Sequence, residues 1–332
     1  MKRSSLRLST VFSMVLAACA VAVAPLARAQ GAASKITYAT VDHPGALSYT
    51  SINGINDFDE FVGIYDDAQG HSHAFEGKKG STHFKAIDFP GAVQTYVFRI
   101  NNLGEVIGTY FDTDGYQHGF IRLPELLPGW SPFYLPFDVP GAGKNKIFDY
   151  ELGTGLGTSA FGINDWGEVV GQYADSTGVG HGYVASLFGF TTYTAPDASQ
   201  IPGFIGGTGL AAINNGGDVA GLYSASPLDP ILVHGFMIHN GRRTLIDPPG
   251  SILTEVFNIN DGQEVSGFYY DAMQIGHGYI YNKAAKTKFQ IIDVPGAVYV
   301  STVGTVNNVN SFVGEYVDGY GITHGYIATR KK

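Results

Sequence analysis

The sequence predicts an all-β domain: a six-bladed β-propeller with four strands per blade, whose ring is closed by the N-terminal strand joining the last blade. Three observations predict this fold. An Ile-Asn or Val-Asn pair and a His-Gly or His-Ala pair each recur six times, at spacings of 43 to 63 residues. Each unit contains four strand-like runs, which is the pattern of a propeller blade. The chain also starts with an outer-type strand and ends without one.

The first 29 residues are predicted to be a secretory signal peptide. A basic start, MKRSSLR, precedes an apolar run, and the small residues of ARA end the segment before Gln30. A competing interpretation is that LAAC, ending at Cys19, resembles a bacterial lipobox whose cysteine is lipidated and retained. Both interpretations place the protein outside the cytoplasm, and residues 30–332 form the predicted propeller domain.

Composition limits the chemistry available after export. Cys19 is the single cysteine, so the mature chain has no disulfide and no thiolate metal site. Four of the 20 Lys and Arg residues lie in the leader, which leaves 16 against 29 Asp and Glu, a net charge of −13. Nucleic acid and anionic membrane surfaces require basic patches, so neither is an expected partner. No second apolar run has the length of a membrane span.

The repeat unit gives the order of strands within a blade. In the third unit, TSAFGIN (158–164) leads through a turn to GEVVGQY (167–173), and then to HGYVASL (181–187) and FTTYT (190–194). Pro-Gly follows the fourth strand in several units and ends it, because proline cannot donate to a strand ladder. The sequence KITYATVDHPGA at the N-terminus is a lone fourth strand, and HGYIATR at the C-terminus is a third strand. Pairing these two would close the ring.

The recurring pattern INxxGxVVGxYxDxxGxxHGF…IDxPGA resembles the HAF-type extracellular repeat of secreted bacterial proteins, over nearly all of the mature chain. The resemblance implies secretion and a repeat architecture. It implies no particular reaction.

The repeated side chains are interpreted as structural, because six equivalent positions cannot all be one active site. Each Asn is expected to hydrogen-bond the turn backbone two residues further on. The six His residues lie too far apart to share a metal ion, so no metal or cofactor is expected. Each imidazole is expected to bond the backbone or the fourth-strand Asp of its own blade, where the candidates are Asp88, Asp138, Asp247 and Asp293. The Asp-x-x-Gly turns, of which DTDG at 112–115 is the best example, are either ordinary turns or weak calcium loops.

Candidate functional residues are those that break the repeat on the innermost strand. Glu255 stands where the other blades have Ser51, Tyr96, Ser159, Gly209 and Thr302, and Arg99 and Asn258 are large at a position that is otherwise small. Glu255 with Tyr96 and Arg99 is a candidate catalytic group, with the carboxylate as general acid or base. The alternative is that these residues form a channel plug or line a solvated channel.

Candidate ligand-binding residues are Asn258, His43 and three aromatic side chains. His43 replaces Phe89, Val139 and Val294 of the equivalent loops. Phe148, Tyr150 and Phe204 lie in the long insertions 143–155 and 198–207, where they either stack against sugar rings or pack over the rim.

Two functions are consistent with these features. The first is a monomeric, secreted binding or scaffold module that takes a polysaccharide or a protein on its loop-rich rim. The alternative is a hydrolase or lyase acting on an extracellular polymer at the mouth of the channel. The fold alone does not choose between them.

Overall fold

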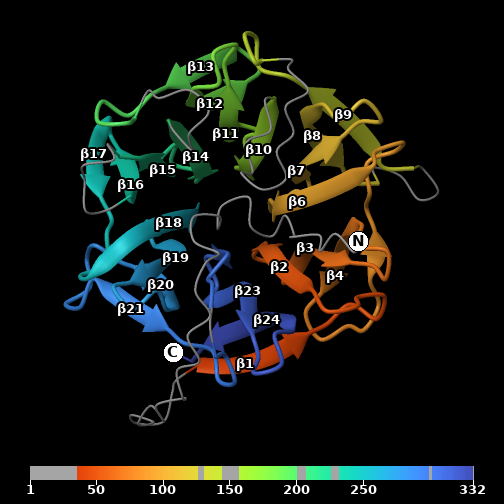
Figure 1. Ribbon diagram of the computed structural model, residues 1–332, viewed down its shortest axis with the longest axis vertical. Helices are drawn as coiled ribbons and strands as arrows, with labels where there is room; N and C mark the ends of the chain where they lie inside the picture. Colours follow the sequence, from red (N-terminus) through yellow and green to blue (C-terminus); the bar gives the residue numbers. More distant parts are fainter. Residues whose placement is uncertain are drawn as a thin grey trace, which may run out of the picture.

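The computed structural model describes residues 36–125, 131–143, 157–199, 207–225, 232–298 and 301–331. They form six sheets of four antiparallel strands arranged in a ring (Figure 1), which confirms the predicted six-bladed propeller. None of the described residues forms a helix with the length and apolar character needed to cross a membrane.

The strands of the first three blades follow one another from the ring axis outward. Blade 1 consists of β2 (Thr50–Ile55), β3 (Glu60–Asp66), β4 (Ser72–Lys78) and β5 (Lys85–Ala86). Blade 2 consists of β6 (Gln94–Ile100), β7 (Val106–Phe111), β8 (Gln117–Leu123) and β9 (Phe133–Phe137). Blade 3 consists of β10 (Thr158–Ile163), β11 (Val169–Ala174), β12 (Gly180–Ser186) and β13 (Gly189–Tyr193).

The last three blades repeat this order, with one exchange at the end of the chain. Blade 4 consists of β14 (Thr208–Ile213), β15 (Val219–Ser224), β16 (Val233–His239) and β17 (Arg242–Leu245). Blade 5 consists of β18 (Ser251–Ile259), β19 (Val265–Asp271), β20 (Gly276–Tyr281) and β21 (Phe289–Ile292). Blade 6 consists of β22 (Thr305–Val306), β23 (Ser311–Val317), β24 (Thr323–Arg330) and β1 (Ile36–Val41).

The N-terminal strand closes the ring as predicted. β1 pairs antiparallel with β24 from Ile36 opposite Arg330 to Val41 opposite Gly325, and the two strands lie side by side in Figure 1. The ring of Tyr38 packs against Phe312 and Tyr326, at centroid distances of 6.3 and 5.8 Å. Both ends of the described chain are thereby held in one sheet.

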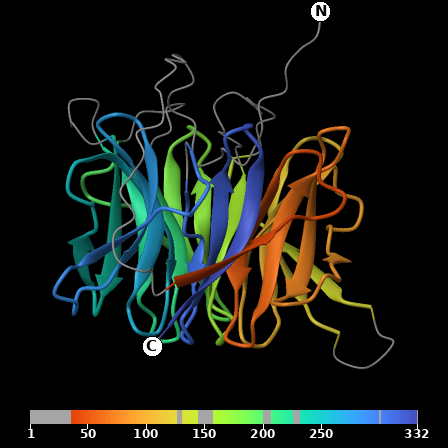
Figure 2. The same cartoon turned by 90° about the horizontal axis from the view of Figure 1, so that it is seen from below.

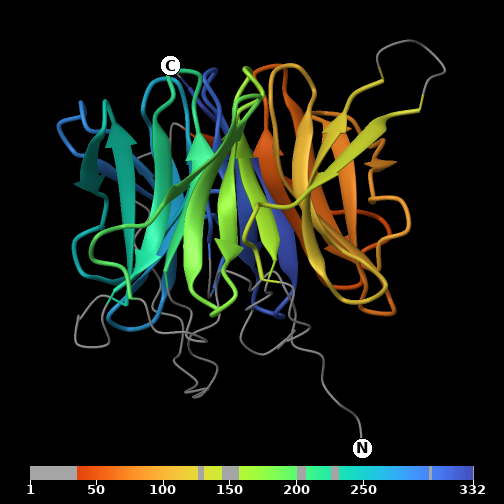
Figure 3. The ribbon, with the colours of Figure 1, turned by 90° about the horizontal axis from the view of Figure 1, so that it is seen from above.

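Strands run roughly along the ring axis, so the turns gather on two opposite faces (Figures 2 and 3). We call one of them the Asn face, because it carries the six turns after the innermost strands, residues 56–59, 101–104, 164–167, 214–217, 260–263 and 307–310. The connections between the third and fourth strands lie on the same face, as the bond from Lys79 N to Asp59 O shows. The C-terminal end of β24 also lies there, because Arg330 N donates to Asn310 O.

The core is built from the aromatic residue that follows each His-Gly or His-Ala pair. These six side chains are completely buried: Phe75, Phe120, Tyr183, Phe236, Tyr279 and Tyr326. Their rings need a glycine on the second strand. At Gly171 an added Cβ would lie 1.9 Å from Ser159 O and 2.7 Å from the Tyr183 hydroxyl oxygen. The glycine therefore allows close contact within the blade, opposite a bulge between Ala160 and Gly162 of the innermost strand.

The repeated His forms a clamp with the neighbouring Tyr and Asp residues, as blade 2 illustrates. His118 Nδ1 lies 2.9 Å from Asp138, its Nε2 lies 3.4 Å from Asp112, and its ring stacks on Tyr110. Asp112 Oδ1 accepts from the amides of Asp114 and Tyr116, so this turn is held as an ordinary capped turn. The predicted pairs of His with fourth-strand Asp are confirmed in blades 1, 2, 4 and 5. In blade 3, Thr194 replaces the Asp, and in blade 6 Asp42 supplies it.

The clamps of blades 1, 2 and 6 hold each imidazole between two Asp carboxylates and favour its protonated form, since only the imidazolium can donate from both nitrogens. The hydrogen bond with Asp138 raises the pKa of His118. Burial lowers the pKa values of His73 and His324, but their hydrogen bonds to Asp residues outweigh burial and raise them.

We expect removal of β1 to destabilise the whole ring. Deletion of residues 36–41 should uncover Phe312 and Tyr326 and cost about 3 kcal/mol, which for a chain of this size lowers the Tm by roughly 5–10 °C. Differential scanning calorimetry measures this. Tyr320→Ala, at a side chain that is 91% exposed, is the control and should leave the Tm unchanged. An unchanged Tm in the deletion would contradict closure by β1.

The clamps also predict how stability depends on pH. A His whose pKa is raised on folding contributes stability below its unfolded pKa of about 6.5, and this contribution is lost as pH rises through the higher folded value. The Tm should therefore fall as the pH rises above about 6.5. His118→Gln should flatten this slope, and an identical slope in the variant would contradict the role of the clamp.

Candidate functional site

The Asn residues join each blade to the next around the axis. In blade 1, Asn56 Oδ1 accepts from Phe58 N and Glu60 N at 3.0 Å, while Nδ2 donates to Asn101 O of blade 2 at 3.2 Å. The same Nδ2-to-carbonyl bond runs from Asn101, Asn164, Asn214, Asn260 and Asn307, and the last of these returns to Asn56 O. The predicted bond from the amide two residues further on is confirmed in every blade except blade 5, where Asn260 Oδ1 accepts from Glu264 N. The bonds to the next blade add a closed circle.

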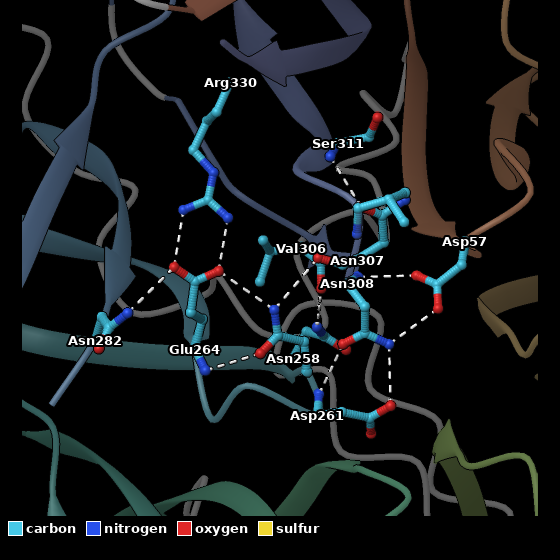
Figure 4. A network of polar contacts seen from close by, with 12 residues as sticks. Asp57, Asn258, Asp261, Glu264, Asn282, Val306, Asn307, Asn308, Ser311 and Arg330 are labelled. Atoms are coloured by element: carbon cyan, nitrogen blue, oxygen red, sulfur yellow. Dashed lines mark hydrogen bonds and ion pairs between the residues drawn. The ribbon is translucent and has the colours of Figure 1, made fainter. Parts of the chain in front are cut away.

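A second circle lies one residue further along each turn. The six side chains alternate between acid and amide: Asp57, Asn102, Asp165, Asn215, Asp261 and Asn308. Each Asn Nδ2 donates to the Oδ2 atoms of both flanking Asp residues, at 2.8–3.1 Å. Figure 4 shows Asn308 between Asp57 and Asp261. We call these six residues the Asp/Asn ring.

The alternation of Asp and Asn gives every side-chain N–H donor in this ring a carboxylate acceptor. A carboxylate only accepts, whereas an amide group carries two N–H donors, so every Asp needs an Asn on each side. Backbone amides complete the pattern, because each ring residue donates its N–H to the Oδ1 of the next, as from Asp57 to Asn102 at 2.9 Å. The ring therefore holds three carboxylates at the axial end of the Asn face.

Sequence reasoning missed the ring, although its signal is visible. The residue after the repeated Asn reads Asp, Asn, Asp, Asn, Asp, Asn along the chain. In a closed ring with an even number of blades, strict alternation gives every Asp two Asn neighbours.

Exposed apolar side chains surround the ring on three turns of the first half of the propeller and on the last turn. We call Phe58, Leu103, Trp166 and Val309 the apolar collar, and Gly216 and Gly262 occupy the same position in blades 4 and 5. Trp166 is 72% exposed, yet its Nε1 donates to Asn215 O of blade 4 at 3.0 Å. Its indole is thus a fixed aromatic surface beside the ring.

Arg99 closes the axis behind the ring. Its Nη1 donates to Asn53 O of blade 1 at 2.9 Å, and its Nη2 donates to Phe257 O of blade 5, on the far side of the channel. Burial lowers the pKa of Arg99 to about 9. Asn258 lies at the same level and donates to Val306 O at 3.0 Å. Both residues therefore bond backbone carbonyls inside the channel. This arrangement agrees with the alternative that they plug the channel, and the plug is held by hydrogen bonds to carbonyls and not by an ion pair.

The predicted catalytic group is not brought together by hydrogen bonds or ion pairs among the described residues. Glu255 is 2% exposed, its Oε2 has no hydrogen-bond partner there, and burial raises its pKa well above the usual value. Tyr96 donates to Gln94 Oε1 at 2.7 Å. The catalytic roles of Glu255, Tyr96 and Arg99 stay a prediction.

His43 packs inside blade 1. Its ring stacks on Tyr65 at 3.7 Å, as Phe89 stacks on Tyr110 at 3.7 Å in blade 2. Its Nδ1 accepts from Gly45 N at 3.1 Å, and burial lowers its pKa. His43 therefore fills the place of an aromatic packing residue. Phe148, Tyr150 and Phe204 lie outside the described residues.

A groove of about 470 Å³ opens between blades 1 and 2. It contains an ion pair in which Arg122 Nη1 and Nη2 donate to Glu76 at 2.8 and 3.2 Å. Lys85 Nζ lies 3.3 Å from the same carboxylate. His83 and Phe84 complete this side of the groove. Within the described ranges no cluster of three or more His, Cys, Asp or Glu side chains could hold a metal ion.

Comparisons with solved structures reach the fold and no further. A protein of Agrobacterium tumefaciens provisionally assigned as TolB is 12% identical at a TM-score of 0.53, over 86% of this chain and 91% of its own. AofleA from Arthrobotrys oligospora is 11% identical at a TM-score of 0.50, over 91% and 84%. The Aleuria aurantia lectin, described as a six-bladed propeller with fucose recognition, is 11% identical at 0.47, over 84% and 91%.

No family model matches this chain, and no curated protein matches it. At these identities the structural likenesses show the propeller fold alone.

We expect the Asp/Asn ring to depend on its amides. Asn308→Asp would place three carboxylates in succession and remove two N–H donors, so the Tm at pH 7 should fall by several degrees. The loss should shrink as the pH approaches 4, because the added carboxyl then takes up a proton. Gln69→Glu, an exposed amide-to-acid change, is the control. Equal Tm values for Asn308→Asp and the wild type would contradict the ring.

Proposed function

We propose that this protein is an exported binding module for an extracellular polysaccharide, which it holds on the Asn face. One observation carries the proposal: Trp166 is largely exposed, and its indole N–H is fixed to the neighbouring blade beside a ring of carboxylates and amides. Export rests on the leader at residues 1–29. The resemblance to HAF-type extracellular repeats supports the same location.

Sugar binding follows from the chemistry of this surface. The C–H faces of pyranose rings stack on exposed aromatic side chains, and their hydroxyl groups need donors and acceptors close by. Trp166 supplies the aromatic surface. Asp165 and Asn215, which bond each other at 2.8 Å, supply carboxylate and amide oxygens that can accept from sugar hydroxyl groups.

The Asn face is favoured over the axis, because Arg99 and Asn258 occupy the channel behind the ring. A polymer would therefore lie across the mouth without entering it. Binding on a face is consistent with a chain whose repeated residues stabilise the blades and join them to one another.

We expect the mature protein to be retained on at least one polysaccharide in a panel of insoluble and soluble extracellular polymers. Trp166→Ala should weaken that binding about tenfold, the equivalent of about 1.4 kcal/mol, in affinity electrophoresis or sedimentation. Tyr320→Ala removes an exposed aromatic from the opposite face and is the matched control. Retention that depends on Tyr320 and not on Trp166 would contradict the proposed face. Release of soluble sugars during the same incubation would favour the hydrolase or lyase alternative.

A further inference from the structure

The groove between blades 1 and 2 lies next to the apolar collar. The turn 101–104 contributes Asn102 to the Asp/Asn ring, Leu103 to the collar and Gly104 to the groove lining. Consecutive residues are about 3.8 Å apart, so the surfaces are continuous on the Asn face. A polymer bound at the collar can therefore extend into the groove.

The groove carries equal numbers of opposite charges. Its basic side chains are Lys78, Lys85 and Arg122, and its acidic side chains are Glu60, Glu76 and Glu125. Glu76 accepts from both nitrogens of the Arg122 fork and lies close to Lys85, so donors and acceptors stand side by side. A balanced surface of this kind favours an uncharged ligand with hydroxyl groups over an anion or a cation.

One polar atom of the Arg122–Glu76 ion pair, the Nε of Arg122, has no hydrogen-bond partner among the described residues. Arg122 is 2% exposed, and its Nε is buried without a hydrogen-bond partner in the part of the chain described. Buried N–H groups in native proteins nearly always have a partner. The Nε atom lies below the surface, so the groups that face the groove of about 470 Å³ are the carboxylate of Glu76 and the ammonium of Lys85.

Rigid apolar surface lies beside these polar groups. Phe84 is fixed by Phe75, His43 and Phe61, at ring centroid distances of 5.3, 5.3 and 6.3 Å. Pro124 lies across the groove, near Gly104. Such surfaces suit the C–H face of a sugar ring and lose little conformational freedom on binding.

We propose that the groove between blades 1 and 2 is a second subsite, which binds an uncharged sugar residue of the polysaccharide held at the collar. This inference rests on the proposed function and adds the ligand class and a second contact. Glu76, held in place by both Nη groups of Arg122, hydrogen-bonds the hydroxyl groups together with Lys85, and Phe84 with Pro124 contacts the sugar ring.

The test uses the full mature chain and neutral oligosaccharides of increasing length, prepared from whichever polymer retains it. Isothermal titration calorimetry should show affinity rising with length until both the collar and the groove are filled. Lys85→Met removes an exposed ammonium and should weaken binding of the long oligosaccharide about tenfold, with little effect on the shortest one that binds. Lys286→Met, at an exposed lysine in the connection before the fourth strand of blade 5, is the control. Glu76→Gln should act in the same direction, and Lys85→Met remains informative if that variant fails to fold.

Outcomes for the groove and for the proposed function are separate. If Trp166→Ala weakens binding and Lys85→Met matches Lys286→Met at every length, the groove subsite is wrong and the proposed function stands. If a carboxymethylated form of the polymer binds more tightly than the neutral one, the ligand class is wrong. If no polymer in the panel binds, both proposals are overturned.

Discussion

The hydrogen bond from each repeated Asn to the next blade is the contact on which this propeller depends. One side chain ties its own turn through Oδ1 and donates through Nδ2 to the carbonyl of the following Asn, six times around the axis. Because the last bond returns to the first blade, no single blade can shift without breaking its hydrogen bonds to both neighbouring blades. This explains why the Asn is unchanged in all six repeats while other positions vary.

The Asp/Asn ring consists of the residues that directly follow the six repeated Asn residues, and it places polar side chains at the surface of the Asn face. Its bonds require three acids among three amides, so the end of the axis on the Asn face is both rigid and acidic. Arg99 occupies the channel behind it. What remains accessible is the mouth edged by Phe58, Leu103, Trp166 and Val309, and the groove next to it. The proposed binding surface is therefore the face, where the blades differ, and not the channel, where Arg99 and Asn258 already bond backbone carbonyls.

The fold was predictable because each blade repeats the same turn residues and strand patterns. The recurring turns mark where strands begin and end, and the unmatched first and last strands showed how the ring of blades closes. The His–Asp pairs were predictable for the same reason. The hydrogen-bond partners of Arg99 could not be predicted, because its acceptors, Asn53 O and Phe257 O, are backbone groups of two other blades. No local sequence pattern reveals such contacts. His43 looked like an exception to its repeat, yet its imidazole stacks on Tyr65 as Phe89 stacks on Tyr110. Chemical type alone did not separate packing from function there.

A crystal structure of the mature protein with a bound neutral oligosaccharide tests the proposed binding face most directly. One sugar ring should stack on the Trp166 indole, with a hydroxyl group near Asp165 or Asn215, and a later ring of the same oligosaccharide should lie between Lys85 and Pro124. An oligosaccharide bound on the opposite face, near Tyr320, or inserted along the axis in place of Arg99, would contradict it.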